Sequence, residues 1–509
     1  MKRLNKTQNT IQGIIWGLVN KTVALIFPFI IRTILIWELG AEYAGLNSLF
    51  TSILQVISLA DLGVGSAIVF SMYRAVSEDN KKMLSAYLNY FRRVFFLIGS
   101  IIVMIGLLIM PFLKYLIKGS IPPDINIYIL YMIYLLNTSI SYFVFAYRSS
   151  ILSAYQREAD NYKFQTVCSS IMYSVQIIVL LLFENYYIYI LFLPIFTFLL
   201  NISRYLYIQK KYPDIKCEGL LPKEQQKEIK DNVFALFLHK VGSVTVNTLD
   251  NIVISSFLGL VILSNYNNYY YLISAVTAIV LILFSSLTAG LGNSIITESR
   301  EKVKRDFYTI FYLNGFLVVV STVCFFNMYQ DFIMLWVGEK YLFNDSTMIL
   351  FCIYYYIHTI RRTIICYRDA AGMWQDNKLQ PIVSSIFNLT LNVVLVQKSG
   401  INGVIASTII SMIFIDIPWE TGKLIKNLFN EPVTKYMFRL MHYSFISVFC
   451  CYLVHLVMEF IYIRHIIFRL TVEFVLSVLT SVVFFAFLTF RMEELKNLKI
   501  IIKKVIRKH

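Results

Sequence analysis

Charged residues are scarce in this chain. Asp, Glu, Lys and Arg make up 15% of its 509 residues, 58% are apolar, and the mean hydropathy is +0.65. Because soluble domains carry about 25% charged residues, this balance excludes a water-soluble protein and indicates an integral membrane protein. The formal net charge is +16, because basic residues outnumber acidic ones. In a hydrophobic chain such an excess belongs in cytoplasmic loops, so nucleic acid is not expected as a partner.

Residues typical of metal centres, disulfides and catalysis are few. The seven cysteines lack CxxC spacing and lie mostly in apolar runs, so neither a disulfide framework nor a zinc site is expected. The sequence also lacks a GxxxxGK[ST] phosphate-binding loop, an HExxH motif and a GxSxG motif. We therefore expect no cofactor, no bound metal and no enzymatic activity.

Long apolar runs dominate the sequence instead. A transmembrane helix needs about 20 mostly apolar residues to cross roughly 30 Å of hydrocarbon. About fourteen runs meet this requirement, which predicts an all-α polytopic membrane protein. They cover residues 11–37, 44–72, 86–112, 126–150, 165–184, 187–208, 233–258, 264–292, 306–329, 346–368, 380–397, 401–422, 437–461 and 465–490.

Loop charges give the orientation of these helices. Lys and Arg accumulate in cytoplasmic loops, and here most of them fall in one alternating set of loops and in the two terminal segments. The N- and C-termini are therefore both expected in the cytoplasm. The opposite set of loops holds only a few basic residues: Lys114, Lys118, Lys340, Lys398 and Arg464.

An internal repeat with an offset near 219 residues divides the chain. Leu39-Gly40 recurs as Leu258-Gly259, and each copy holds six helices, an even number, so both copies enter the membrane from the same side. Parallel repeats of this kind place a substrate site near the midplane between two pseudo-symmetric lobes. The predicted domains are an N-terminal lobe (1–212), a cytoplasmic linker (213–232), a C-terminal lobe (233–425), two additional transmembrane helices (437–490) and a cytoplasmic amphipathic tail (491–509).

Cations within the spans are the first candidates for function, because ionisable residues in a membrane are costly and usually meet a partner or line a cavity. Lys21 maps onto Lys240 at the repeat offset, and each lies about a third to half of the way across the membrane. Arg32 follows Lys21 by almost three helical turns and so shares its face. These residues indicate a net-positive track suited to a phosphate or diphosphate group.

Polar residues on the second lysine helix extend this candidate site. Asn247 and Asn251 share the face of Lys240, and Asp250 lies just beside it. The alternative is that both lysines are tied to Asp61, to Asp250 or to a backbone carbonyl and only fix helix packing.

Charges occur at three further places in the apolar runs. Arg361 and Arg362 interrupt an apolar run, and only one of two adjacent arginines can point into a cavity. Asp61 is either a proton or cation carrier or the partner of an arginine. Asp416 and Glu420, near the inner end of the twelfth run, are expected at an exposed edge.

Four segments resemble the Wzx-type polysaccharide flippases of the multidrug/oligosaccharidyl-lipid/polysaccharide exporter superfamily. They are FIIRTIL (29–35), LGAEYAGLNSLFTSIL (39–54), LADLGVGSAI (59–68) and LWVG (335–338). Asn47 lies in the second segment and joins the candidate substrate-binding residues. Where that family often has Glu, this chain has Asp61.

The resemblance implies a flippase that moves undecaprenyl-diphosphate-linked oligosaccharide from the inner to the outer leaflet of a bacterial cytoplasmic membrane. A polysaccharide polymerase and glycosyltransferases are its implied protein partners. Two alternatives stay open: a cation-coupled multidrug exporter of the same fold, and a polymerase or ligase, which would need a longer external loop with catalytic residues.

Overall fold

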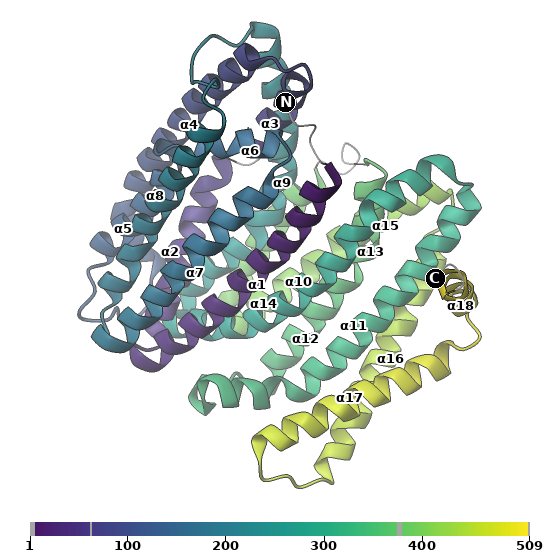
Figure 1. Ribbon diagram of the computed structural model, residues 1–509. Coiled ribbons are helices and arrows are strands. Elements are labelled where there is room, and N and C mark those ends of the chain that lie inside the picture. Colours follow the sequence, from purple (N-terminus) through teal and green to yellow (C-terminus); the bar gives the residue numbers. More distant parts are fainter. Residues whose placement is uncertain (1–5, 62–63, 374–378, 507–509) are drawn as a thin grey trace. The chain divides into compact units, whose positions relative to one another are not determined.

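The computed structural model describes residues 6–61, 64–373 and 379–506 (Figure 1). Within these ranges it does not describe the side chains of residues 6–8, 10, 60–61, 232, 234–247, 289 and 500–506. Every regular element in the described residues is helical, which confirms the predicted all-α fold. The chain divides into two compact units, Met1–Ser264 and Asn265–His509.

The first unit is built from nine α-helices, three short 3-10 helices and the first turn of a tenth α-helix. They are α1 (Lys6–Glu38), α2 (Ala41–Ile57), η1 (Ser58–Asp61), α3 (Val64–Ser77), α4 (Lys81–Ile109), η2 (Met110–Leu116), α5 (Ile127–Phe143), η3 (Ala146–Arg148), α6 (Ser149–Ala154), α7 (Glu158–Phe183), α8 (Tyr186–Lys211), α9 (Lys223–Leu258) and the start of α10 (Leu260–Thr297).

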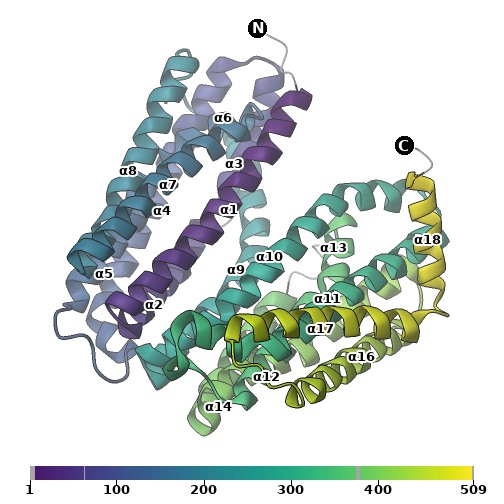
Figure 2. The same ribbon diagram turned by 60° about the horizontal axis from the view of Figure 1, so that its bottom comes forward.

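Helix α1 packs along α7 (Figures 1 and 2). A Cβ atom at Gly17 would lie 3.3 Å from the ring of Tyr162, so the two helices approach closely at that position. One polar contact joins the same pair, because the Thr166 hydroxyl donates to Asn20 Oδ1 at 3.2 Å. Helix α1 is therefore fixed along α7.

Two repeat-related glycines share one conformation. Gly40 separates α1 from α2 with φ 114° and ψ 170°, and Gly259 separates α9 from α10 with φ 94° and ψ 177°. Positive φ at this ψ strains every residue except glycine. The Leu-Gly pair that reveals the repeat in the sequence is therefore a helix-breaking turn that both copies require.

The second unit holds the remainder of α10 and the helices that follow it. They are α11 (Arg300–Val337), η4 (Glu339–Tyr341), α12 (Asp345–Ile360), α13 (Arg362–Ala370), α14 (Gln380–Ser411), η6 (Met412–Asp416), α15 (Ile417–Leu424), η7 (Ile425–Phe429), α16 (Thr434–Glu459), α17 (Ile466–Thr489) and α18 (Glu493–Ile506).

Helix α14 turns back on itself. Gly400, with φ 57° and ψ −133°, breaks its helical conformation. The residues on either side pair in antiparallel order: Ser384 contacts Ser411 at 3.0 Å, and Asn388 Nδ2 donates to the Thr408 hydroxyl at 3.0 Å. The expected helices 380–397 and 401–422 are thus the two legs of one helical hairpin, which polar contacts hold together.

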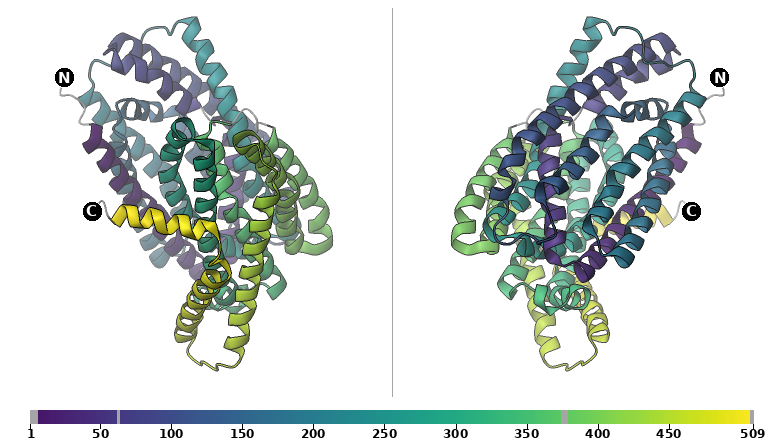
Figure 3. Two further views of the ribbon diagram at one scale, coloured as in Figure 1. Left: turned by 90° about the vertical axis from the view of Figure 1, so that its right-hand side faces the viewer. Right: turned by 90° about the vertical axis from the view of Figure 1, so that its left-hand side faces the viewer.

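Helices α16 and α17 pack against α11 in the second unit (Figure 3). Buried aromatic rings fill their contact, with Phe311 and Tyr443 at 5.5 Å and Tyr443 and Phe485 at 5.6 Å between centroids. The predicted tail forms α18, where Glu494 pairs with Arg439 of α16 at 3.0 Å. The two additional helices and the tail are therefore fixed to the same unit.

The chain is a multi-pass membrane protein. Nine helices of the described residues are long and apolar enough to span a membrane, or ten when α5 and α6, bent by 46°, count as one span. The hairpin of α14 falls within one of the nine, Gln380–Phe429. Each of the fourteen expected runs overlaps helical residues of the described chain, and the number of crossings stays a prediction.

The boundary between the compact units differs from the predicted domain boundary. The sequence places the second lobe at 233–425, whereas α9 belongs to the first unit, which ends at Ser264. The reason is that α9 packs on α2 and α3. For example, Asn251 Nδ2 donates to the Ser52 hydroxyl at 2.8 Å. The six-helix pseudo-symmetry of the two lobes remains a prediction.

Candidate functional site

The two predicted cations on α1 have different surroundings. Arg32 is half-buried and donates from Nη2 to the backbone oxygen of Ser264 at 2.8 Å. Lys21 is exposed, and within the described part of the chain it makes no recorded hydrogen bond or ion pair. Arg32 therefore joins α1 to the first turn of α10, while Lys21 is available to a ligand.

Asn47 and Asn251 each form a hydrogen bond to a neighbouring helix. Asn47 on α2 accepts a hydrogen bond from the Tyr134 hydroxyl at 2.6 Å, and Tyr134 contacts the Tyr186 hydroxyl at 3.1 Å. Asn251 on α9 is bonded to Ser52 of α2, and Asp250 beside it is buried. These contacts bind α2 to α5 and to α9.

Three further candidates lie outside the described side chains. Lys240 and Asn247 are on α9, and Asp61 is the last residue of η1. The structure places these residues on their helices, and their side-chain contacts lie outside the described residues. Their predicted roles stay predictions.

In the second unit Arg361 lies in a buried ionic cluster. Its Nη1 is 2.9 Å from Asp416 and its Nη2 is 3.0 Å from Glu420, while its Nε makes a second bond to Glu420 at 3.1 Å. Arg368 approaches Glu420 at 3.5 Å, and Gln380 donates to Asp416. Two carboxylates thus neutralise Arg361 and satisfy its donors, which favours a packing role for this arginine.

This cluster corrects one expectation. Asp416 and Glu420 were expected at an exposed edge, but they are 8% and 3% exposed. The π-helical turn η6 carries Asp416 and leads directly into α15, which carries Glu420. Because the two residues are one helical turn apart, both carboxylates reach the same guanidinium.

Arg362 differs from its neighbour. Its Nη2 lies 2.8 Å from Nε2 of His358, and its Nε, although buried, has no hydrogen-bond partner among the described residues. No carboxylate in the described part of the chain pairs with it within ion-pair distance. Of the two adjacent arginines, Arg362 is therefore the one that retains an unused donor.

A loop fastened to α4 positions the start of α9. Lys81 and Asp214 pair at 2.6 Å, the Ser85 hydroxyl accepts from the backbone N–H of Lys216 at 3.1 Å, and Asn89 donates to the Gly219 carbonyl at 2.8 Å. The hydrogen bond from Lys81 lowers the pKa of the exposed Asp214 carboxyl below its usual value. These contacts hold residues 212–222 on α4 and so place α9 beside it.

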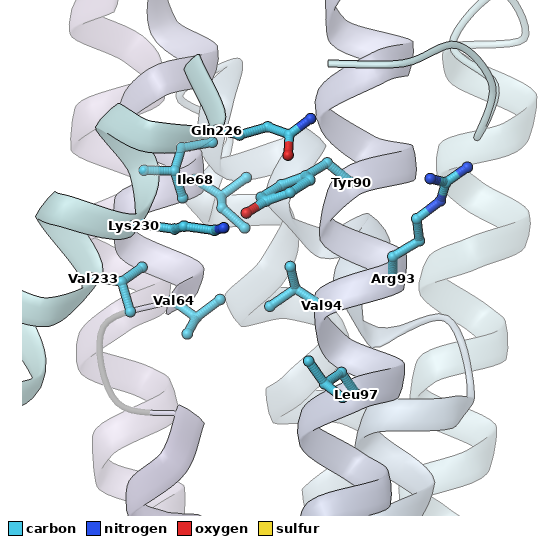
Figure 4. Close-up of a pocket in the computed structure, with 10 residues that line it drawn as sticks. Val64, Ile68, Tyr90, Arg93, Val94, Leu97, Gln226, Lys230 and Val233 are labelled. Atoms are coloured by element: carbon cyan, nitrogen blue, oxygen red, sulfur yellow. The ribbon is translucent and has the colours of Figure 1, made fainter. Parts of the chain in front are cut away.

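A pocket of about 530 Å³ lies between α3, α4 and α9 of the first unit (Figure 4). None of the predicted site residues lines it. Its walls carry polar and basic groups as well as aliphatic side chains. The lining residues are Val64, Ile68, Tyr90, Arg93, Val94, Leu97, Gln226, Ile229, Lys230 and Val233.

Sequence reasoning missed a second ionic cluster in the second unit. Arg469 Nε on α17 lies 2.6 Å from Asp331 on α11 and 3.0 Å from Glu473, and Glu473 is 1% exposed. Arg469 and Glu473 are four residues apart in an apolar run, a spacing typical of a helical ion pair, so this signal was present in the sequence. No group of three or more metal-ligating side chains occurs among the described residues.

Solved structures with the same fold are membrane transporters. The chain resembles the lipid II flippase MurJ in an inward closed conformation, with TM-score 0.69 and 16% identity over 94% of this chain and 99% of that one. It resembles a multidrug resistance MATE family transporter in its inward-facing conformation, with TM-score 0.60 and 12% identity over 80% and 97%. A transporter of the MOP superfamily from Pyrococcus furiosus matches with TM-score 0.51 and 11% identity over 84% and 97%.

At these identities the structural matches establish the fold. No curated protein matches the chain. The family model described as polysaccharide biosynthesis protein matches residues 10–289, more than half of the sequence. This confirms the resemblance found in the N-terminal motifs: the chain belongs to the polysaccharide biosynthesis protein family, with a fold like those of MurJ and of a MATE family transporter.

Proposed function

We propose that this protein is a flippase that moves undecaprenyl-diphosphate-linked oligosaccharide repeat units from the inner to the outer leaflet of a bacterial cytoplasmic membrane. The observation that carries this proposal is the family match over residues 10–289. The similarity of fold to a lipid II flippase supports it. The exported oligosaccharides would serve surface polysaccharides such as capsule or O-antigen, with glycosyltransferases before this step and a polymerase after it.

Basic residues give the proposed chemistry. A diphosphate carries concentrated negative charge, which Lys and Arg side chains offset through charge-assisted hydrogen bonds. Lys21 is exposed on α1 and has no recorded partner in the described residues, and we assign Lys240 the same role in the second repeat. Arg362, with its unused donor, is a better candidate than Arg361, whose donors the two carboxylates satisfy.

The steps of transport follow from this assignment. The basic residues hold the diphosphate, the sugars cross within the protein, and the lipid tail stays in the bilayer. Alternation between inward and outward access moves the bound lipid from one leaflet to the other, as in other transporters built from parallel repeats. No group transfer is involved, in keeping with the expectation that the protein is not an enzyme.

Deletion of the gene tests the proposed function. Lipid-linked oligosaccharide should accumulate on the cytoplasmic face while the cell surface loses its polysaccharide, and the wild-type gene should restore both. Lys21→Gln combined with Lys240→Gln should fail to restore export while remaining in the membrane. A matched control, Lys340→Gln with Lys398→Gln, removes two lysines from expected external loops and should export normally.

Multidrug export is the second candidate, because the fold also matches a multidrug resistance MATE family transporter. In that case deletion leaves surface polysaccharide unchanged and alters drug tolerance. That pair of results would overturn the flippase proposal. Normal export by the Lys21→Gln/Lys240→Gln variant would overturn the assignment of the two lysines.

A further inference from the structure

The pocket of the first unit lies where polar helix segments give way to apolar ones. On α4, Arg92 and Arg93 are the last charged residues before an uncharged run that extends from Val94 to Leu113. Twenty residues of helix cover about 30 Å, the thickness of the hydrocarbon core. The side chains at positions 92 and 93 therefore lie at the level of lipid head groups, and those from Val94 onward lie among acyl chains.

Helix α9 shows the same transition beside it. Lys230 and Asp231 are the last charged residues before Val233 and the apolar residues that follow. The two helices run in the same direction at this point, because each begins at the end of an expected cytoplasmic loop. The head-group level inferred from α4 thus coincides with the one inferred from α9.

The pocket changes character along this direction. Its α4 wall is one helical face, with Tyr90 and Arg93 followed by Val94 and Leu97. Its α9 wall follows the same order, because Gln226 and Lys230 precede Val233, and α3 adds the aliphatic Val64 and Ile68. The polar end of the pocket carries Gln226, Tyr90 and Lys230 beside the aliphatic Ile68, and the other end is wholly aliphatic (Figure 4).

The charge at the polar end has one sign. None of the ten lining residues is Asp or Glu, and in the described part of the chain neither Lys230 nor Arg93 belongs to an ion pair. Figure 4 shows Lys230 reaching from α9 into the pocket, while the Arg93 guanidinium extends outward from α4 at the rim. The polar end therefore attracts an anion, first at Lys230 and then at the rim.

We propose that this pocket binds an anionic phospholipid from the leaflet that faces the start of α4 and α9, the cytoplasmic leaflet in the expected topology. The head-group phosphate lies at Lys230, with Arg93 adding positive charge at the rim, and an acyl chain lies against Val64, Val94 and Leu97. A free phosphate would leave the aliphatic end unfilled, and a neutral apolar molecule would leave the cations unneutralised. Basic pockets between transmembrane helices on the cytoplasmic side bind anionic lipids in this way.

Bound lipid has a structural consequence. The pocket is lined by α3, α4 and α9, so a lipid bound in it touches all three helices and links α9 to α4. The fastened loop at residues 212–222 already holds the start of α9 against α4. The lipid adds a second attachment deeper in the membrane.

Native mass spectrometry of the purified full-length protein tests the proposal. The probes are phosphatidylglycerol, which is anionic, and phosphatidylethanolamine, which is zwitterionic, with matched acyl chains. The test variant is Lys230→Gln with Arg93→Gln. Its control is Lys227→Gln with Arg92→Gln, which removes the same charge from the same two helices at positions that do not line the pocket.

The wild type and the control should retain phosphatidylglycerol in preference to phosphatidylethanolamine. The test variant should bind phosphatidylglycerol roughly 25-fold more weakly, since each basic residue at an anionic surface is worth about fivefold in affinity. Val94→Trp, which fills the aliphatic end and keeps both cations, should also reduce binding.

Three results would overturn the proposal. One is equal affinity of the test variant and its control for phosphatidylglycerol. Another is equal retention of the two phospholipids by the wild type. The third is displacement of phosphatidylglycerol by undecaprenyl phosphate at equal concentration, because the pocket would then hold the polyprenyl tail of a transported lipid.

Discussion

Arg361 in the second unit and Lys230 in the first are both cations, but their surroundings differ. Arg361 is buried and meets Asp416 and Glu420, whereas Lys230 faces a pocket without a carboxylate. The difference shows that the role of a basic residue in this protein depends on acidic residues from other helices. A cation that the fold neutralises holds helices together, and a cation left unneutralised can bind an anion.

Burial determines how much stability is lost when each of these cations is removed. A buried charge that loses its partner remains uncompensated in a medium of low polarity, which is strongly destabilising. An exposed charge that is removed leaves nothing unpaired. The predictions below run from the most buried cation to the most exposed one.

The largest expected effect is that of Arg361→Leu. The substitution leaves Asp416 buried without a cation and Glu420 with only Arg368 at 3.5 Å, and it should destabilise the protein by about 3–5 kcal/mol. Thermal unfolding of the purified protein in detergent measures the loss. Arg362→Leu is the control, and it should cost clearly less because no carboxylate pairs with Arg362 in the described residues. Equal losses in the two variants would remove the distinction between the arginines.

A smaller loss is expected from Arg469→Leu, since this arginine is 48% exposed by side chain although Glu473 beside it is buried. Removal of the guanidinium leaves Asp331 and Glu473 facing each other and should cost about 1–3 kcal/mol. Arg464→Leu in the preceding loop is the matched control and should unfold like the wild type. An unchanged unfolding temperature in Arg469→Leu would contradict the ionic contact between α11 and α17.

Lys21→Gln should change stability by less than about 0.5 kcal/mol, because Lys21 is exposed and the substitution removes no packing. Export of surface polysaccharide should nevertheless fall. The two measurements together separate a binding residue from a packing residue. A large loss of stability with proportional loss of export would identify Lys21 as a structural cation like Arg361.

The smallest effect is expected for the exposed pair of Lys81 and Asp214. The pKa of Asp214 is lower than usual because Lys81 donates a hydrogen bond to it. Its contribution is therefore present at neutral pH and lost as the pH falls through the lowered pKa. Asp214→Asn and the wild type should differ only slightly at neutral pH and converge in acid. A difference that grows on acidification would contradict the direction of this shift.

The fold could be predicted largely from the sequence, because apolar run length and the positions of loops report directly on helices in a membrane. The turn at Gly40, repeated at Gly259, was visible as a recurring Leu-Gly pair. The assignment of α9 to the first unit was not predictable, because it depends on contacts such as Asn251 with Ser52, which no periodicity reveals.

The roles of individual charges were much harder to predict. Arg361 was a candidate for substrate binding because its partners are distant in the sequence. Asp416 and Glu420 follow only after the α14 hairpin. The spacing of those two acids in an apolar stretch was the available signal, just as the spacing of Arg469 and Glu473 was. Which helix such a pair faces is a matter of tertiary packing.

Reconstitution of the purified protein in liposomes tests the central claim most directly. The liposomes contain a labelled undecaprenyl-diphosphate-linked oligosaccharide, and loss of label accessible to an external reagent reports movement between leaflets. We expect the wild type and Lys340→Gln/Lys398→Gln to move the lipid and Lys21→Gln/Lys240→Gln to leave it in place. Two results would contradict the account. One is that Lys21→Gln/Lys240→Gln moves the lipid as well as the wild type does, and the other is that the wild type does not move it.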